Sequence, residues 1–257
     1  MKENNIEKFM IGYGFSKEDI NYIKNKLLKY YKCQSISKNL KYNLVYLSYL
    51  FESQEIIDLT KRCINLCSIN IELLSSRIIK LINLNYTMED IKHIIQRFPN
   101  ILTYSNKKID DKLYFLKSYG YKDEDIYKMT IINPGIFSYN IETLNDKLKL
   151  LNNYFSKEEI IIITVNFPSI FASRIDLLTN KLNLMLKIGI KDEILRRPKN
   201  LMQSSELIYA RYMHMKSLNI ELTNQNSRIL FFEEKKYSDR YNQTNKSLIK
   251  KYKFEKM

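Results

Sequence analysis

Several residue types are scarce in this 257-residue chain. It has no Trp, two His, three Cys, four Pro and five Gly. An odd number of cysteines (Cys33, Cys63 and Cys67) in a chain of this length favours free thiols in a reducing compartment over a disulfide framework. The few glycines and prolines favour long regular elements with few sharp turns.

The residue patterns of known catalytic and metal sites are absent as well. His93 and His214 are far apart, and neither belongs to the paired His or Cys patterns that zinc sites use. Cys63 and Cys67 are one helical turn apart, but Cys67 falls in a column of apolar residues, so we predict a buried thiol. No glycine-rich phosphate loop is present. The sequence therefore predicts a protein that is not an enzyme and has no metal, cofactor or small-molecule substrate.

Long apolar runs are also missing. No uninterrupted run approaches the ~18 residues that a membrane-spanning helix requires, so we expect no membrane association. The first twenty residues contain four acids (Glu3, Glu7, Glu18 and Asp19) and lack both an apolar segment and an Arg-rich presequence. We therefore expect no secretory or organellar targeting signal, and a cytoplasmic protein.

Basic residues, in contrast, are abundant. The chain has 42 Lys and Arg against 28 Asp and Glu, a net charge of +14. Such a charge favours polyanionic partners, and nucleic acid more often than an anionic membrane. The many Ile, Lys, Asn and Tyr residues also indicate an AT-rich coding genome, which accounts for part of the lysine excess without a function.

The four prolines mark an internal repeat. Pro99, Pro134, Pro168 and Pro198 are separated by 35, 34 and 30 residues. A period in this range is typical of repeat architectures. Because proline lacks an amide hydrogen and restricts the preceding residue, we expect a helix to end before each one.

A helix-start pattern precedes the prolines. A Ser or Thr that can cap a helix is followed three residues later by an acid, which the positive end of the helix dipole favours. The pairs are Thr87 and Asp90, Ser156 and Glu159, and Ser16 and Asp19.

After each proline we predict a 3₁₀-like turn and then a second helix. This helix has apolar residues ten, fourteen and seventeen positions past the proline, which share one helix face. The three clearest sets are Ile109, Leu113 and Leu116; Leu144, Leu148 and Leu151; and Leu178, Leu182 and Met185. Gly120 and Gly189 follow where a helix end favours a left-handed residue.

The same template extends toward the N-terminus without proline. A shift of 35 residues places Ile64 where Pro99 would be, and a degenerate first unit at about residues 15 to 50 has Leu40, Leu44 and Leu47 as its stripe. Such units bury their apolar faces only by stacking on one another. We predict an all-α solenoid of six units in a single domain over residues 1–223, and a capping helix with a basic tail over residues 224–257.

A column of cations recurs thirteen residues past the proline position. Its members are Arg77, Lys112, Lys147, Lys181 and Arg211, and only the first unit differs, with Asn43. In a regular superhelix these side chains would form a stripe, for which a phosphate backbone is the expected ligand. The alternative is an ordinary solvent-exposed position in a lysine-rich protein.

Further candidate nucleic-acid-binding cations lie near the prolines. Arg196, Arg197 and Lys199 flank Pro198, Arg97 holds the matching place before Pro99, and Arg174 lies at the start of a second helix. Each of these alone is a typical surface charge, and together they strengthen the basic field. Tyrosines outside the stripes, such as Tyr104, Tyr139 and Tyr209, suit either wall packing or stacking on unpaired bases.

These motifs resemble a known family. The run from the Ser or Thr cap through P-x-I-L/F to L-x-x-K-L-x-x-L, clearest over about residues 86 to 190, is similar to the mitochondrial transcription termination factor (mTERF) repeat. The resemblance implies a left-handed superhelix of units with two α-helices and a 3₁₀ turn, whose positively charged concave groove holds double-stranded DNA or structured RNA. It also implies a role in transcription termination, genome expression or ribosome assembly, often inside an organelle.

The sequence thus supports two functions. The first is a monomeric, non-catalytic protein that binds duplex DNA or structured RNA and acts in transcription regulation, transcription termination or RNA metabolism. The second is a helical-repeat adaptor that binds an acidic protein surface. Salt dependence separates them, because a duplex binder loses affinity steeply as salt rises.

Overall fold

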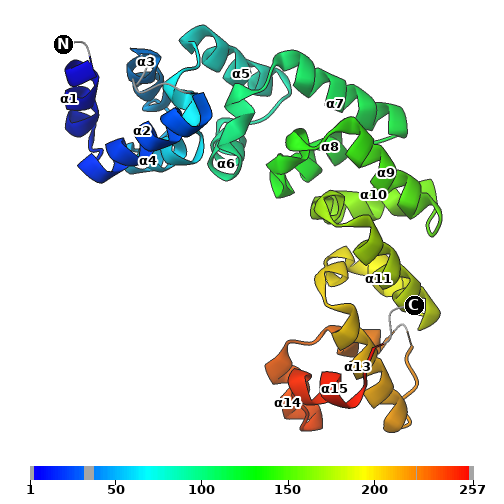
Figure 1. The fold of residues 1–257 in the computed structure, drawn as a ribbon. Coiled ribbons are helices and arrows are strands. Elements are labelled where there is room, and N and C mark those ends of the chain that lie inside the picture. Colours follow the sequence, from blue (N-terminus) through cyan, green and yellow to red (C-terminus); the bar gives the residue numbers. More distant parts are fainter. Residues whose placement is uncertain (1–2, 32–37, 224, 255–257) are drawn as a thin grey trace. The chain divides into compact units, whose positions relative to one another are not determined.

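The computed structural model describes residues 3–31, 38–223 and 225–254. Within these ranges every regular element is an α-helix or a 3₁₀ helix (Figure 1). The predicted all-α, helical-repeat fold is therefore confirmed. None of the helices in the described ranges has the length and apolar character needed to cross a bilayer.

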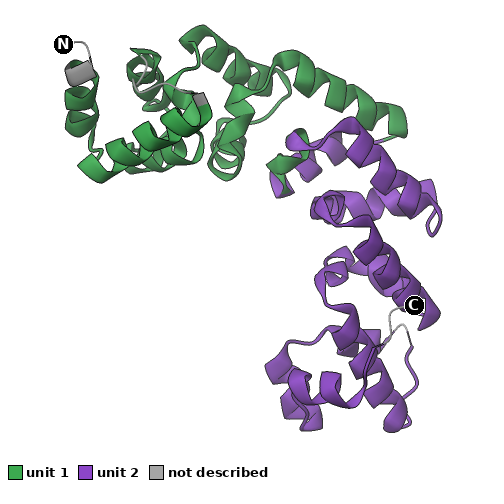
Figure 2. Ribbon diagram, viewed as in Figure 1, with its two compact units in different colours: residues 1–120, 133–137 green, residues 121–132, 138–257 purple. Residues whose placement is uncertain are grey.

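The helices group into two compact units (Figure 2). Unit 1 comprises residues 1–120 and 133–137, and unit 2 comprises residues 121–132 and 138–257. The elements of unit 1 are α1 (Glu3–Tyr13), α2 (Lys17–Tyr31), α3 (Lys38–Leu47), α4 (Ser53–Arg62), η1 (Ile64–Cys67), α5 (Ile71–Asn83), α6 (Met88–Arg97), η2 (Pro99–Thr103), α7 (Asn106–Tyr119) and all but the last residue of η3 (Pro134–Ser138). Those of unit 2 are α8 (Asp123–Ile132), α9 (Ile141–Asn152), α10 (Lys157–Asn166), η4 (Pro168–Ala172), α11 (Ile175–Lys187), α12 (Lys191–Arg196), η5 (Pro198–Met202), α13 (Ser205–Ser217), η6 (Ser227–Phe231), α14 (Glu234–Tyr241) and α15 (Asn245–Lys251).

Each repeat has two helices, and the 3₁₀ turn that joins them has the predicted form. Phe98 leaves the helical conformation at φ −140° and ψ 70°, and Pro99 then opens η2. Proline disfavours the α region for the residue before it, which explains this break. Cys63 has a similar conformation, φ −124° and ψ 82°, before Ile64 and η1. The turn is therefore a property of the repeat, and proline reinforces it.

Helix starts follow the predicted caps. The Thr87 side chain accepts a hydrogen bond from the Asp90 amide, and the Asp90 carboxylate accepts one from the Thr87 amide. Ser156 with Glu159, and Ser16 with Asp19, form the same reciprocal pair. Each pair satisfies two amides that the first turn of a helix leaves without a partner.

Helix ends use left-handed residues at one repeated position. Gly120 and Gly189 have φ values of 117° and 77°, as predicted. Asn85 and Asn219 occupy the same column, twenty-one residues past Ile64 and Pro198, with φ values of 63° and 55°. Asparagine tolerates this conformation better than most residues, so the column could have been completed from the sequence.

The predicted stripes form the core. All nine apolar positions of the three clearest units are buried, and Leu40, Leu44 and Leu47 of the first unit are fully buried. The C-terminal segment differs from the single predicted capping helix, because it forms η6, α14 and α15. Helix α15 packs on α13, and Tyr237 and Leu248 are fully buried there.

Candidate nucleic-acid interface

The cation column is buried. Arg77, Lys112, Lys147 and Arg211 are 9%, 3%, 5% and 0% exposed, and Lys181 is half-buried. Arg77, Lys112, Lys147 and Arg211 are therefore not the exposed residues that either interpretation of the column expected, whereas Lys181 keeps part of its surface in solvent. A side chain at this depth needs internal partners, because a buried charge without hydrogen bonds is costly.

Two column residues donate to carbonyl oxygens at the 3₁₀ turn of the following repeat. Lys181 donates a hydrogen bond from Nζ to the carbonyl oxygen of Leu201 in η5. Arg211 donates from Nη1 to the carbonyl oxygens of Leu230 and Phe232, at 2.9 and 2.6 Å. These carbonyls end a 3₁₀ helix, where main-chain acceptors lack partners within the helix. These bonds join the second helix of one repeat to the turn of the next repeat.

The exception in the column performs the same task without a charge. Asn43 in α3 is fully buried, and its Nδ2 donates to the carbonyl oxygens of Leu66 and Ile69, at 2.8 and 2.9 Å. At three positions of the column a side-chain donor thus reaches the next turn, and Asn43 does so without a charge. We interpret the column as a set of internal hydrogen bonds that hold successive repeats together.

The arginines of the column also hold the starts of later helices. Arg77 donates to Oδ1 of Asn106, the first residue of α7, at 2.9 Å, and Arg211 donates to Oδ1 of Asn245, the first residue of α15, at 2.8 Å. Burial lowers the pKa of both guanidinium groups, and it also lowers the pKa of Lys147 and Lys181. All four shifts have desolvation as their first cause, as expected of cations inside the protein.

The other predicted cations are exposed. Arg97, Arg174, Arg196, Arg197 and Lys199 all have solvent-accessible side chains. Two of them bind nearby carboxylates. Arg174 makes two hydrogen bonds to Asp176, at 3.1 and 2.7 Å, and Arg197 donates to both oxygens of Glu193, at 3.1 Å. Because Glu193 is 1% exposed, Arg197 has a structural role in balancing a buried carboxylate.

The structure adds Arg62 to the exposed cations. Arg62 ends α4 as Arg97 ends α6 and Arg196 ends α12, each two residues before the turn. Its Nη2 donates to the carbonyl oxygen of Arg97 at 3.2 Å, at the negative end of the α6 dipole. A shift of 35 residues aligns Arg62 with Arg97, so the repeat contained the signal for it.

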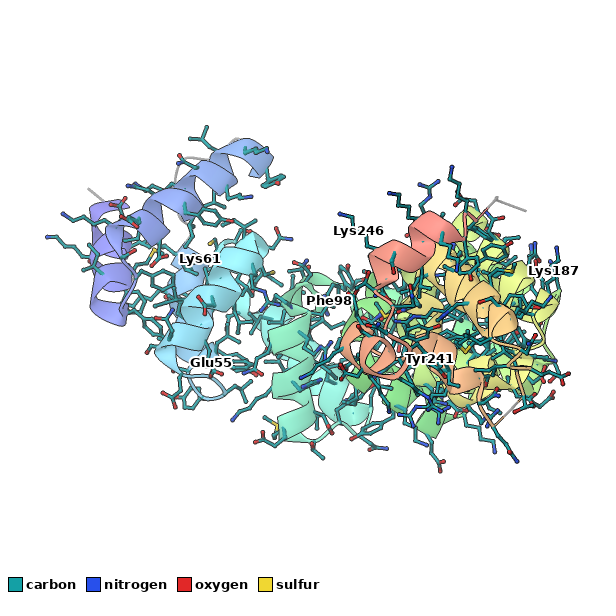
Figure 3. The ribbon with its side chains drawn as sticks, turned by 90° about the horizontal axis from the view of Figure 1, so that it is seen from below. Glu55, Lys61, Phe98, Lys187, Tyr241 and Lys246 are labelled. Carbon is teal, nitrogen blue, oxygen red and sulfur yellow. The ribbon has the colours of Figure 1, made fainter. Side chains whose placement is uncertain are left out.

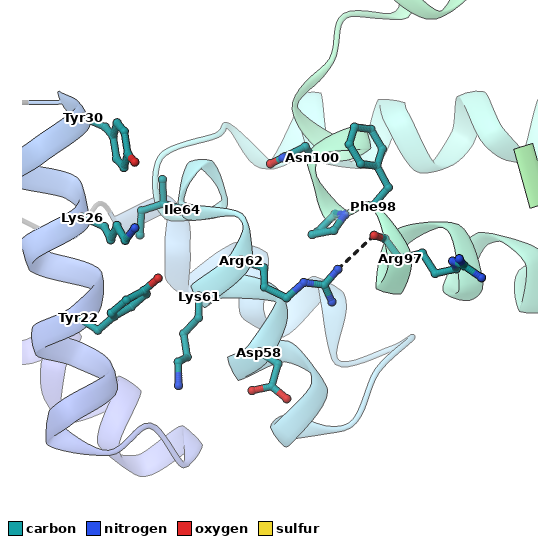
Figure 4. Close-up of a pocket in the computed structure, with 11 residues that line it drawn as sticks. Tyr22, Lys26, Tyr30, Asp58, Lys61, Arg62, Ile64, Arg97, Phe98 and Asn100 are labelled. Atoms are coloured by element: carbon teal, nitrogen blue, oxygen red, sulfur yellow. Dashed lines mark hydrogen bonds between the residues drawn. The ribbon is translucent and has the colours of Figure 1, made fainter. Parts of the chain in front are cut away.

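Arg62 lies at a cleft of about 840 Å³ in unit 1 (Figure 4). Its lining comes from α2, α4, η1, the end of α6 and η2, and comprises Tyr22, Lys26, Tyr30, Asp58, Lys61, Arg62, Ile64, Arg97, Phe98, Pro99 and Asn100. Lys61 forms an ion pair with Asp19 at 2.6 Å, and this hydrogen bond is the main cause that lowers the pKa of Asp19. The cleft contains four cationic side chains and one carboxylate.

Unit 2 also carries exposed cations outside its 3₁₀ helices. Lys187 and Lys246 are both exposed, and Figure 3 shows where they lie among the other side chains of the unit. Exposed cations are therefore present in both units.

Repeated helix pairs joined by 3₁₀ turns, with exposed cations at the helix ends, define an α-helical repeat protein with a basic surface. Comparison with protein-family models matches residues 26–238 to the mTERF family, and the chain belongs to this family. Its members are generally non-catalytic, nucleic-acid-binding helical repeat proteins with roles in transcription and RNA metabolism. Comparison with curated protein sequences finds no match.

The two described cysteines are buried, as predicted for Cys67. Cys63 and Cys67 are 1% and 0% exposed, and burial raises the pKa of Cys63 to about 11 and that of Cys67 to about 12. Because the thiolate is the reactive form, we expect both thiols to react with an aromatic disulfide reagent at pH 8 at least about 100-fold more slowly in the folded chain than in urea. A Cys33→Ser variant isolates these two thiols, since Cys33 lies outside the described residues. Equal labelling rates in the two states would contradict this assignment.

Proposed function

We propose that this protein binds duplex DNA or structured RNA through exposed cations at its helix ends, without catalysis of its own. In this proposal it acts as a monomer in transcription regulation, transcription termination or RNA metabolism. Family membership supports nucleic acid as the ligand class. The net charge of +14 supports a polyanionic ligand and also opposes self-association.

The observation that carries the proposal is the recurrence of an exposed arginine at the end of a first helix. Arg62 and Arg97 hold this place in unit 1, and Arg196 holds it in unit 2. The two repeats between Arg97 and Arg196 have Ile132 and Asn166 at this position instead. Contacts of this kind neutralise phosphates and position the protein on the nucleic acid without reading its sequence.

Charge neutralisation at these positions tests the proposal. We expect an Arg62→Gln/Arg97→Gln/Arg196→Gln variant to bind duplex DNA or RNA more weakly than the wild type. We also expect the slope of log affinity against log salt to become shallower by about 3, one unit for each lost phosphate contact. Fluorescence anisotropy across a salt series measures both quantities.

A matched variant controls for net charge. Lys128, Lys149 and Lys250 are exposed, and none of them is the residue that ends the first helix of a repeat, so Lys128→Gln/Lys149→Gln/Lys250→Gln removes the same charge elsewhere. We expect this variant to retain most of the slope. Equal losses in the two variants would show that the binding is unlocalised, and a wild type without salt-dependent binding would refute the function.

A further inference from the structure

We propose that the cleft of unit 1 binds unpaired nucleotides of a single-stranded nucleic-acid segment. This inference rests on the proposed function and adds a second binding mode at a defined place. The cleft lies between α2 on one side and α4, η1 and η2 on the other (Figure 4). It combines the two features that single-strand binding requires, which are exposed aromatic faces and nearby cations.

Helix α2 supplies the aromatic wall. Tyr22, Lys26 and Tyr30 are spaced four residues apart and therefore share one helix face. Tyr22 is 42% exposed and Tyr30 is 59% exposed, so core packing does not account for their rings. The Lys26 Nζ lies 5.4 Å from the centre of one ring and 5.7 Å from the other. Figure 4 shows both rings directed from α2 into the cleft, on either side of Lys26.

The opposite wall supplies further positive charge. Arg62 uses one guanidinium nitrogen on the Arg97 carbonyl, at 3.2 Å, which fixes its orientation and leaves other N–H groups to bind a phosphate. Lys61 lies beside it on α4 and shares its charge with Asp19. The Arg97 side chain points away from the tyrosines in Figure 4. Lys26, Lys61 and Arg62 are thus the cations on the tyrosine side, against the single carboxylate of Asp58.

The geometry favours unpaired bases over a duplex. Eight residues of α-helix place Tyr22 and Tyr30 about 12 Å apart along α2, a separation that suits a short run of nucleotides. Bases inside a duplex stack on their neighbours, and only unpaired bases offer their faces to side chains. Phe98 does not take part, because its ring packs edge-on against Tyr104 with the ring centres 5.7 Å apart. The two tyrosines are therefore the stacking platforms.

The test compares single strands with duplexes on the full chain. We would titrate the protein into labelled single-stranded DNA and RNA of about 12 nucleotides, and into the matching duplexes, at physiological salt. For Tyr22→Leu/Tyr30→Leu we expect single-strand affinity to fall about 30-fold, at about 5-fold or more per ring, with little change for the duplex. Tyr22→Phe/Tyr30→Phe keeps the rings and should bind single strands like the wild type.

Controls make the outcomes distinct. Tyr42 and Tyr114 are 60% and 76% exposed and lie outside the cleft, so Tyr42→Leu/Tyr114→Leu should leave single-strand affinity unchanged. Circular dichroism checks that each variant is folded. If the Tyr22 and Tyr30 leucine variant binds single strands like the wild type, the cleft is not their site, while duplex binding keeps the proposed function. Equal losses on both ligands would overturn the preference for unpaired nucleotides. A wild type that binds neither ligand would refute both proposals.

Discussion

Replacing Arg211 by alanine should destabilise the chain by about 3 to 5 kcal/mol, since it removes a fully buried side chain whose partners then lack donors. The carbonyls of Leu230 and Phe232 and the Asn245 side chain would each lose a hydrogen bond. The guanidinium carbon also lies 4.3 Å from the centre of the Tyr237 ring, and this contact would be lost as well. Urea unfolding followed by circular dichroism measures the difference.

The damage should be largest in the segment that Arg211 holds. Hydrogen exchange is expected to accelerate in η6, α14 and α15, because their link to α13 is weakened. Arg240→Ala is the matched control, since Arg240 is exposed in α14, and it should change stability by less than about 0.5 kcal/mol. Equal stability of the two variants would contradict the internal role of Arg211.

Charge reversal inside the column should have the second large effect. Lys181→Glu places a carboxylate where Lys181 now donates to the Leu201 carbonyl, so an acceptor would face an acceptor. We expect a loss of about 3 kcal/mol or more, enough to unfold a marginally stable chain. Lys181→Met removes only the donor and should cost about 1 to 3 kcal/mol. Thermal unfolding monitored by circular dichroism ranks the two variants.

The matched control for this prediction is Lys149→Glu. Lys149 is exposed in the last turn of α9, and its reversal should cost at most about 1 kcal/mol through the helix dipole. If Lys181→Glu unfolds no more easily than Lys149→Glu, then Lys181 is a surface residue and its proposed role in holding successive repeats together is wrong.

The repeat could be predicted from the sequence because its signals are local. Capping pairs such as Ser156 and Glu159, and a proline that ends the first helix, act within a few residues. The apolar stripes follow from helix geometry alone, so Leu144, Leu148 and Leu151 could be placed in the core without any knowledge of their neighbours. These are the parts of the prediction that the structure confirms.

The burial of the cation column could not be predicted, because it depends on contacts between successive repeats. Lys112 stands beside the core residue Leu113, at the edge of the apolar face, where helix periodicity does not decide between solvent and a neighbouring turn. For Lys181 and Arg211 the turn of the next repeat lies at this edge and accepts their hydrogen bonds. Asn43 was the available signal, since an amide at a position otherwise held by cations indicates a need for a donor.

The cleft could not be predicted from the repeat. Tyr22 and Tyr30 belong to α2, whereas Arg62 lies at the end of α4, and the cleft forms only when these helices pack. The repeat spacing aligns equivalent positions of different repeats, but it does not show which positions of neighbouring repeats face one another. This information is tertiary, and a single sequence does not carry it in its local pattern.

The most direct test of the account compares the salt dependence of duplex binding for two folded variants. Lys147→Met/Lys181→Met changes the buried column, and Arg62→Gln/Arg97→Gln/Arg196→Gln changes the exposed helix ends. We predict that the column variant is less stable yet keeps the wild-type slope of log affinity against log salt, whereas the helix-end variant loses about 3 from that slope. A column variant that loses the slope while the helix-end variant keeps it would show that the buried cations contact the phosphates, and would contradict the account.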